Sequence, residues 1–390
     1  VPVVTPSLII ASLALGIWIY LVLFRGGFWL AREREAQDQP VMQIAGDWPS
    51  VVAVIPARNE ALALPRTLAS LSAQDYPGRF SLVVVDDDSS DGTGATARAL
   101  AATLDREIAV LQGEALPPGW TGKIFAMHQG IAYAETAKDA LDYFLLTDAD
   151  IEYPPDAVTR LIARAKASST VLTSLMVRLN CESLAERALI PAFVFFFQML
   201  YPFAWVNRRD AKTAAAAGGC MLVDRRALAR AGGIARIRAA LIDDCALARL
   251  LKAEGPIWLG LSNNVLSLRS YPRFGDIRRM VARSAYAELD CSPLLLIVTV
   301  AGMVLTYLAG PILAIFAPFP ANAVASLAWA LMTLTFLPIL RFYRVSPLWA
   351  AALPLIAAAY LAFTFDSAYQ HWRGRGGAWK GRSQALAAKR

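Results

Sequence analysis

Carboxylates occur in short clusters that lie far apart in this sequence of 390 residues. Asp148 and Asp150 flank a single alanine, and Asp243 is followed directly by Asp244. Two carboxylates at alternate positions can be aimed at one divalent cation, and hard oxygen ligands suit Mg²⁺ or Mn²⁺. A carboxylate held beside a substrate hydroxyl can act as a general base, and we expect this of the pair Asp243 and Asp244. The alternative for one member of that pair is helix capping, because a helix is predicted from Cys245.

Two more polar clusters follow predicted strands. Residues 50–56 and 80–85 are short, continuously apolar and rich in valine, which is typical of strands buried on both faces. The first strand leads into Pro56, Ala57, Arg58 and Glu60, and the second ends in Asp86 and Asp87.

The elements that must position these residues alternate between strand and helix. We predict a weaker strand at 107–111, a strand at 143–146, and helices at 58–73, 93–104 and 123–137. This alternation indicates an α/β fold with a mostly parallel sheet.

The polar clusters follow the carboxyl ends of these strands, which is where open α/β sheets bind ligands. They are therefore expected to converge on one edge of the sheet. The alternative is that each cluster is only a turn or a helix cap, which is the role we expect for Ser90 and Asp91.

A glycine-punctuated loop at 113–123 ends in Lys123, at the start of a predicted helix. An ammonium at this place can contact a phosphate as a point charge. The alternative is a solvated lysine with no ligand.

Uncharged segments flank the α/β part of the chain. Residues 1–24, 291–340 and 345–365 carry no charge, and about 20 apolar residues suffice for a helix to cross a bilayer. We predict a transmembrane anchor at 1–25, a globular domain at 48–290, membrane segments at 291–365 and a basic tail at 366–390. The break within 291–340 is expected at Gly310-Pro311 or at 318–320. A signal peptide at the N-terminus is less consistent with Arg25, Arg32 and Arg34, which follow the apolar run.

A further uncharged stretch, 188–207, contains Pro191 and Pro202. We interpret it as an aromatic helix that lies in the membrane interface or lines an acceptor groove; the alternative is a buried core helix.

The net charge is +7, but the basic residues cluster beside apolar segments, which favours anionic lipid headgroups over nucleic acid as their partner.

The sequence offers little for histidine or cysteine chemistry. It has two histidines, so a histidine metal site or a Ser-His-Asp triad is not expected. The spacing of the four cysteines matches no zinc or redox motif, and we expect them to be reduced and buried.

The ordered motifs at 54–60, 85–93, 147–150 and 242–247 resemble the signature of family 2 glycosyltransferases. These are inverting enzymes with a GT-A fold, a Rossmann-like α/β domain, that use nucleotide-sugar donors. The flanking membrane segments are similar to those of ceramide glucosyltransferase. Residues 117–123, 188–206, 216–223 and 376–382 give a closer resemblance to the hopene-associated glycosyltransferases of bacterial hopanoid biosynthesis.

This resemblance implies roles for individual residues. Asp244 would be the base, with Asp243 in place of the family's glutamate. Asp148 and Asp150 would hold Mg²⁺ or Mn²⁺ on the donor diphosphate, and Arg283 would contact that diphosphate although the surrounding box lacks its tryptophan. The nucleoside would be bordered or contacted by Pro56, Ala57, Arg58, Glu60, Asp86 and Asp87.

The resemblance implies an inverting transfer of a hexose or N-acetylhexosamine from a nucleotide sugar, most simply a UDP-sugar, to a membrane lipid. The acceptor is left open between a hopanoid, a polyprenyl phosphate and a glycerolipid. Other classes are an inactive nucleotide-binding scaffold and a transporter, the latter disfavoured because 291–340 and 345–365 contain no charges. We expect a multi-pass protein of the bacterial inner membrane with a cytoplasmic catalytic domain, two C-terminal crossings and a third segment, 346–365, that does not cross.

Overall fold

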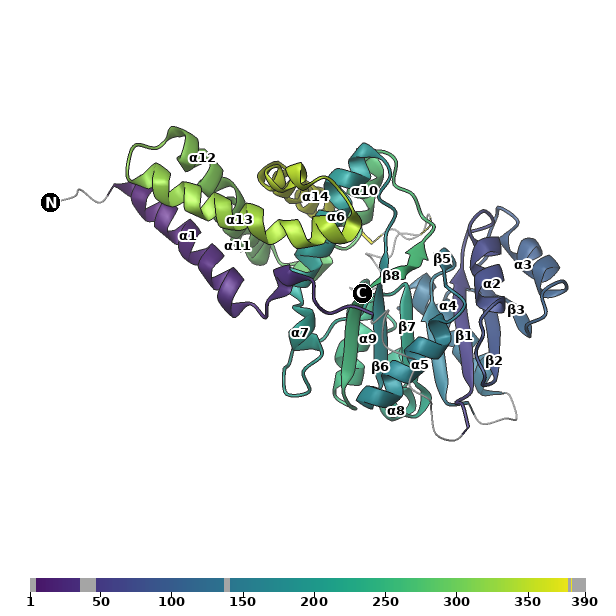
Figure 1. Ribbon diagram of the computed structural model, residues 1–390. Coiled ribbons are helices and arrows are strands. Elements are labelled where there is room, and N and C mark those ends of the chain that lie inside the picture. Colours follow the sequence, from purple (N-terminus) through teal and green to yellow (C-terminus); the bar gives the residue numbers. More distant parts are fainter. Residues whose placement is uncertain (1–4, 36–46, 137–140, 378–379, 381–390) are drawn as a thin grey trace. The chain divides into compact units, whose positions relative to one another are not determined.

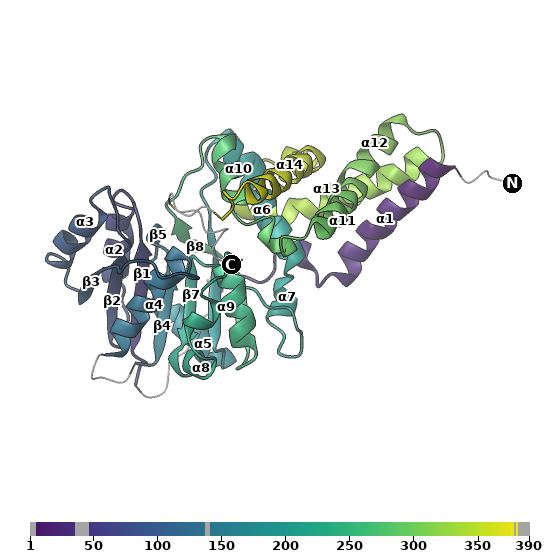
Figure 2. The same ribbon diagram turned by 180° about the vertical axis from the view of Figure 1, so that it is seen from behind.

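The structure is a computed structural model that describes residues 5–35, 47–136, 141–377 and 380. The chain divides into two compact units. The helical unit takes its described residues from 5–32, 181–204 and 271–377, and the α/β unit takes them from 33–180 and 205–270 together with Lys380. Each unit is described by itself below (Figures 1 and 2).

The α/β unit is built on one eight-stranded sheet of order β3-β2-β1-β4-β7-β6-β8-β5. Strands β3, β2, β1 and β4 pair in parallel, whereas β7 is antiparallel to both β4 and β6. The sheet confirms the predicted mostly parallel α/β fold. It also contains the antiparallel strand β7. The strands are β1 (Val51–Ala57), β2 (Phe80–Asp86), β3 (Ile108–Gln112), β4 (Tyr143–Thr147), β5 (Ile151–Glu152), β6 (Leu172–Arg178), β7 (Cys220–Asp224) and β8 (Ile257–Ser267).

Helices connect and cover these strands (Figure 1). Three of them, α2 (Leu64–Ser72), α3 (Thr93–Ala101) and α4 (Gly122–Glu135), link the parallel strands near the positions that the sequence predicts. The remaining short elements are α5 (Ala157–Ser168), α7 (Phe203–Val206), α8 (Arg225–Arg230), η2 (Ile234–Ile237) and α9 (Asp243–Lys252).

The first predicted helix, 58–73, was wrong at its start. Asn59 has a left-handed backbone with φ of 52°, and Pro65 occupies the first turn of α2, where its missing N–H costs nothing. The amides of Asn59, Glu60 and Ala61 donate instead to side chains of the 89–93 loop. These bonds compete with helix formation, so 58–63 is a loop that follows β1.

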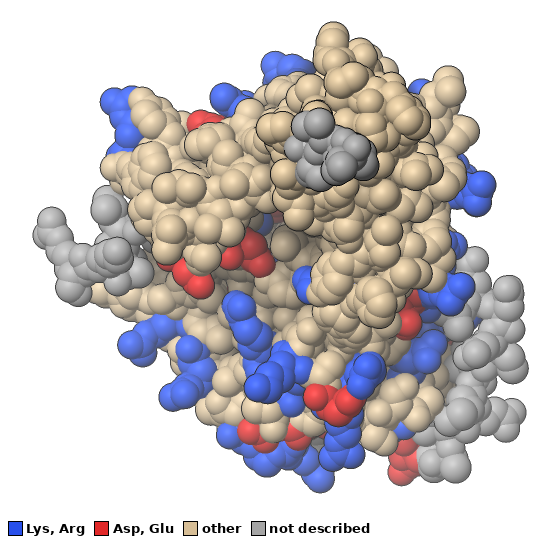
Figure 3. All heavy atoms as spheres, turned by 90° about the vertical axis from the view of Figure 1, so that its left-hand side faces the viewer, with Lys and Arg blue, Asp and Glu red and all other residues tan. Residues whose placement is uncertain are grey.

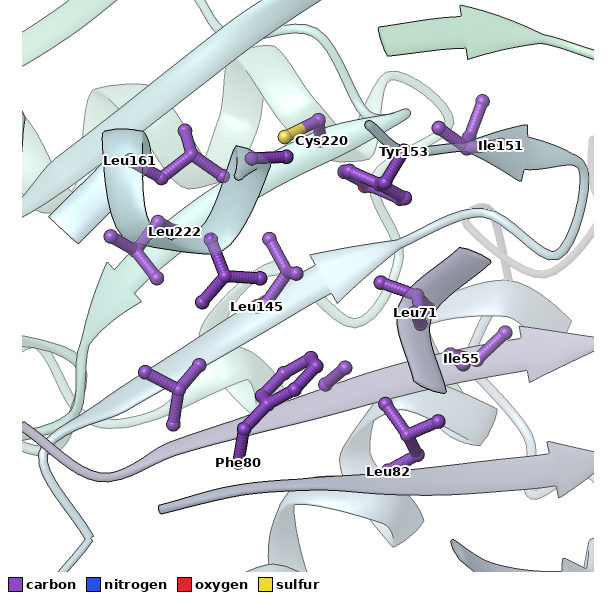
Figure 4. Packing of buried hydrophobic residues seen from close by; sticks show 14 of the residues in the cluster. Ile55, Leu71, Phe80, Leu82, Leu145, Ile151, Tyr153, Leu161, Cys220 and Leu222 are labelled. Atoms are coloured by element: carbon purple, nitrogen blue, oxygen red, sulfur yellow. The ribbon is translucent and has the colours of Figure 1, made fainter. Parts of the chain in front are cut away.

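The sheet core is apolar and continuous. Ile55, Leu82 and Leu145 point to the same face of their strands and pack with Leu71 of α2 and Leu161 of α5 (Figure 4). All of these side chains are buried. The strands are consequently fixed in register, with Ala57 of β1 opposite Asp86 of β2.

The helical unit contains three helices long and apolar enough to cross a membrane, among the residues that the structure describes: Pro6–Phe24, Pro293–Phe316 and Ala321–Tyr343. They fit the expected N-terminal anchor and two C-terminal crossings. Figure 3 shows an outer surface on these helices that is mostly free of charged side chains. The elements are α1 (Pro6–Phe24), η1 (Phe28–Leu30), α6 (Leu184–Leu200), α10 (Phe274–Ala282), η3 (Ala287–Leu289), α11 (Pro293–Met303), η4 (Val304–Leu308), α12 (Ala309–Phe316), α13 (Ala321–Tyr343), η5 (Pro347–Ala350) and α14 (Leu353–Trp372).

The break between the two C-terminal candidate spans lies at 317–320, one of the two predicted places. Gly310-Pro311, the other, lies inside α12, where a proline ring clashes with the carbonyl four residues earlier. The chain accommodates it with a π-helical turn, η4, directly before α12. The carbonyl of Thr306 in this turn accepts a hydrogen bond of 2.8 Å from Trp18 Nε1 of α1.

Part of the predicted segment 188–207 lies in α6, which buries Ile190, Val194 and Phe195 in the helical unit and ends at Leu200, before Pro202. Its role at a membrane interface or acceptor groove remains a prediction. None of the four cysteines forms a disulfide, but Cys181 and Cys291 are only partly buried, so their predicted burial was wrong.

Candidate functional site

Asp148 and Asp150 lie in a turn that follows β4, rather than in an extended segment. Main-chain bonds fix the turn: the carbonyl of Ala149 accepts from Thr67 Oγ1 at 2.9 Å, and that of Asp150 accepts from the amide of Leu268 at 2.8 Å. At its base, Thr147 Oγ1 accepts a 2.7 Å bond from the buried Tyr153 hydroxyl. The turn is therefore preorganised by three different elements.

Lys123, at the start of α4, connects this turn to the start of α9. Its Nζ lies 2.8 Å from Asp148 Oδ1 and 3.0 Å from Asp243 Oδ2. Burial alone would lower the pKa of Lys123, but the two carboxylates outweigh burial and raise it. Loss of hydration raises the pKa of Asp148 despite its partial exposure, and Lys123 opposes this shift. The lysine is thus a fixed cation between the two acidic clusters.

Asp244 is held by two backbone amides. Its Oδ2 accepts from Gly218 N at 2.9 Å and its Oδ1 from Cys245 N at 2.7 Å. Burial raises the pKa of Asp244 to about 6, and the neighbouring Asp243 adds to the shift. A carboxylate with this pKa is well suited to accept a proton near neutral pH.

Gly218 allows this close arrangement. A Cβ at this position would lie 3.2 Å from Lys123 Nζ and 3.5 Å from Asp244 Oδ2. Gly218 belongs to a motif quoted above for the family resemblance, but its packing role could not be predicted without the fold.

A second group lies where β1 and β2 end. Asp87 is buried, and its amide donates to the carbonyl of Ala57 at 2.8 Å. The guanidinium of Arg58 lies 3.5 Å from the Asp87 carboxylate and donates to its main-chain carbonyl. Asp86 is also buried and accepts from Ser89 N at 3.2 Å. The structure therefore brings Arg58, Asp86 and Asp87 to one sheet edge, as predicted.

Asp91 has the turn-or-cap role that was expected for it, because its side chain accepts from amides at the start of α3 and in the loop after β1. Its Oδ1 accepts from Thr93 N and its Oδ2 from Ala61 N, both at 3.0 Å. Hydrogen bonds to the ionised form lower its pKa although slight burial opposes them.

Sequence reasoning missed Arg269, which follows β8. Its Nε lies 2.6 Å from Asp150 Oδ2, and its Nη2 forms an ion pair with Glu60 Oε1. Burial raises the pKa of Glu60, and Arg269 opposes that shift. Arg269 thereby joins the β1 loop to the Asp148–Asp150 turn. No sequence motif around Arg269 indicates this role, because the role depends on β8 ending at the same edge of the sheet.

Among the described residues there is no group of three or more His, Cys, Asp or Glu that could hold a metal. Asp148 and Asp150 nevertheless offer carboxylate oxygens on one short turn, which fits a Mg²⁺ or Mn²⁺ ion whose remaining ligands are water and substrate phosphates.

Pro56 and Ala57 lie buried at the end of β1, beside the same edge of the sheet. Arg283 follows α10 in the helical unit, so its contact with a donor remains a prediction.

Residues 52–232 match the model of glycosyl transferase family 2. This part of the chain, 181 of the 390 residues, is similar to a family 2 glycosyltransferase domain. The matched region includes the polar clusters at 56–60, 86–87 and 148–150, whereas Asp243 and Asp244 follow it. It also includes strands β2 to β7 and nearly all of β1, whereas β8 and Arg269 follow it.

Curated relatives match part of the chain. A 4,4'-diaponeurosporenoate glycosyltransferase of Staphylococcus haemolyticus is 30% identical over 146 residues, which are 37% of this chain and 34% of that protein. An undecaprenyl-phosphate 4-deoxy-4-formamido-L-arabinose transferase of Aeromonas hydrophila is 30% identical over 118 residues, 30% and 33% of the two chains. The chain thus spans about a third of the length of these relatives.

Among solved structures, a mannosyltransferase from Pyrobaculum calidifontis, in complex with GDP-Man and Mn²⁺, is similar with a TM-score of 0.58. It is 17% identical, and the alignment covers 93% of this chain and 98% of that chain. This likeness supports the GT-A fold.

Proposed function

We propose that the chain transfers a sugar from a nucleotide-sugar donor to a membrane lipid with inversion at the anomeric carbon. The observation that carries the proposal is the position of Lys123 between Asp148 and Asp243. It brings the turn expected to hold the donor diphosphate next to the acids expected to activate the acceptor. Both lie in the α/β unit, which holds most of the residues that match the family 2 glycosyltransferase model.

Asp244 is the general base of this proposal. The carboxylate accepts the proton of the acceptor hydroxyl, whose oxygen forms a bond to the anomeric carbon while the bond to the donor diphosphate breaks. The nucleoside diphosphate leaves with the electron pair of that bond. Hydrogen bonds from two backbone amides orient Asp244 to accept the proton. Asp243 pairs instead with Lys123.

Asp148 and Asp150 would hold a Mg²⁺ or Mn²⁺ ion, which when bound neutralises charge that develops on the leaving diphosphate. Lys123 supplies a second positive charge beside the same turn. Arg58, Glu60, Asp86 and Asp87 would orient the nucleoside, for which a UDP-sugar is the first donor to test, and Arg283 remains a further phosphate contact to test.

A lipid acceptor is supported by the three candidate spans and by the names of two relatives, which contain diaponeurosporenoate and undecaprenyl phosphate. The proposed location is the bacterial inner membrane with the α/β unit on the cytoplasmic side, where nucleotide sugars are made. A hopanoid, a polyprenyl phosphate and a glycerolipid are the acceptors to compare.

The proposal is tested with the purified full chain, a bacterial lipid extract, Mg²⁺ or Mn²⁺, and a panel of UDP- and GDP-sugars. We expect the mass of a hexose or N-acetylhexosamine to be added to one lipid class. Separate reactions with a hopanoid, a polyprenyl phosphate and a diacylglycerol then identify that class. Nucleotide binding without transfer to any lipid would contradict the proposal and indicate a scaffold.

A further inference from the structure

Lys380 lies in the α/β unit beside the loop that follows β1. It contacts Arg58 of this loop although the two residues are 322 positions apart in the sequence. Its chain neighbours 378–379 and 381–390 lie outside the described residues, including Trp379, Gly381 and Arg382 of the motif noted above. The contacts of Lys380 itself are described.

These contacts run in both directions. Lys380 Nζ lies 2.7 Å from Glu60 Oε1 and donates to the carbonyl of Asn59 at 3.3 Å. Arg58 Nε in turn donates to the carbonyl of Lys380 at 3.3 Å. Lys380 therefore holds three consecutive residues of the β1 loop, two of which were predicted to bind the nucleotide.

The loop is held by side chains from several parts of the unit. Asn59 has a φ of 52°, a left-handed conformation that asparagine adopts more readily than most residues other than glycine. Side chains of the 89–93 loop hold it on one side. Glu60 is paired both with Lys380 and with Arg269, and Arg269 also contacts Asp150. A continuous set of ion pairs thus runs from Lys380 to the turn with Asp148 and Asp150.

We propose that Lys380 is a positioning residue of the donor site, which fixes Arg58 and Glu60 for nucleotide binding. This inference rests on the proposed function, since it assigns the occupant of the site as a nucleoside diphosphate. Lys380 acts through Glu60 and Arg58 and has no part in the chemical step. Its loss is therefore expected to weaken donor binding and to leave the turnover of bound donor nearly unchanged.

The test compares the full chain with Lys380→Met and Lys380→Arg, and with Lys212→Met as a matched control at an exposed lysine of the same unit. Calorimetry with UDP and with GDP, each with Mn²⁺, measures affinity. We expect Lys380→Met to weaken the binding of whichever nucleotide the wild type prefers about tenfold, as befits loss of a charge-assisted contact. Lys380→Arg should recover most of the affinity, and Lys212→Met should match the wild type.

Kinetics separate positioning from a general loss of structure. Lys380→Met should raise the KM for the donor and leave kcat and the KM for the lipid within about twofold of wild type. Unchanged or tighter nucleotide binding by Lys380→Met, or an equal fall in kcat, would overturn the inference. If the wild type binds neither nucleotide, the proposed function itself fails, which is a distinguishable result.

Discussion

The ammonium of Lys123 lies 3.0 Å from the carboxylate of Asp243, a residue 120 positions later in the chain. The same ammonium lies 2.8 Å from Asp148. Removing it would leave Asp148, Asp243 and Asp244 close together without this counter-charge. Lys123→Met is therefore expected to lower the thermal stability of the donor-free protein and to reduce kcat/KM by about 100-fold or more.

Lys123→Arg serves as the control, because it keeps the charge but changes its geometry. It should restore stability more than activity. Wild-type stability and kcat/KM in Lys123→Met would contradict a central role for this lysine.

The raised pKa of Asp244 predicts the pH dependence of transfer. A general base must be ionised, and the pKa of about 6 means that Asp244 loses its proton as the pH rises through that value. We expect log kcat/KM to rise with unit slope below pH 6 and to level off above pH 7.

Asp243→Asn tests this origin of the pH dependence. The charge of Asp243 raises the pKa of Asp244, so its removal should shift the acidic limb to lower pH. A shift to higher pH, or an unchanged midpoint near pH 6, would show that another group titrates.

Gly94 at the start of α3 leaves room for Asp86. A Cβ at Gly94 would lie only 2.1 Å from Asp86 Oδ2, so Gly94→Ala must displace that carboxylate. We expect the KM for the donor to rise about tenfold or more, with kcat affected less. Steady-state kinetics with the preferred nucleotide sugar measure both.

Gly275→Ala in α10 is the matched control, because a Cβ there meets nothing nearer than 3.7 Å. Alanine is the better helix former, so this variant should be neutral or more stable by up to about 1 kcal/mol. An unaltered donor KM in Gly94→Ala would argue against a nucleotide role for Asp86.

The ion pair between Arg269 and Asp150 predicts competition with a metal. The guanidinium contacts the carboxylate of Asp150, the group that would hold Mn²⁺. Arg269→Gln should therefore tighten Mn²⁺ binding in the absence of nucleotide, whereas Asp150→Asn should weaken it. Electron paramagnetic resonance of free Mn²⁺ during a titration measures both effects, and equal affinity in all three proteins would contradict the assignment of Asp150 as a ligand.

The contact of Lys380 with Glu60 also predicts the membrane topology. Residues in contact lie on the same side of a bilayer, so an even number of crossings must separate Glu60 from Lys380. The candidate spans Pro293–Phe316 and Ala321–Tyr343 supply two. Cysteines introduced at Lys212 and Arg373 should therefore be labelled from the same side by an impermeant reagent, and labelling from opposite sides would contradict this topology.

The sequence alone was sufficient for the elements with strong local patterns. The valine-rich runs that became β1 and β2, and the acids that follow them, lie where their pattern predicted. The residues at 58–63 escaped prediction because their amides bond to side chains about 30 positions later. Arg269 and Lys380 escaped because their roles depend on which strands and segments return to one edge. Local propensity carries no information about such long-range contacts.

The most direct test of the account is to measure sugar transfer and donor binding together in Asp244→Asn. The substitution keeps the shape of the side chain but removes its ability to accept the proton. The account predicts that transfer to lipid falls by at least about 1,000-fold while the Kd for the nucleotide stays within about threefold of wild type. Transfer at a wild-type rate would contradict the assignment of the base, and loss of nucleotide binding would place Asp244 in the donor site instead.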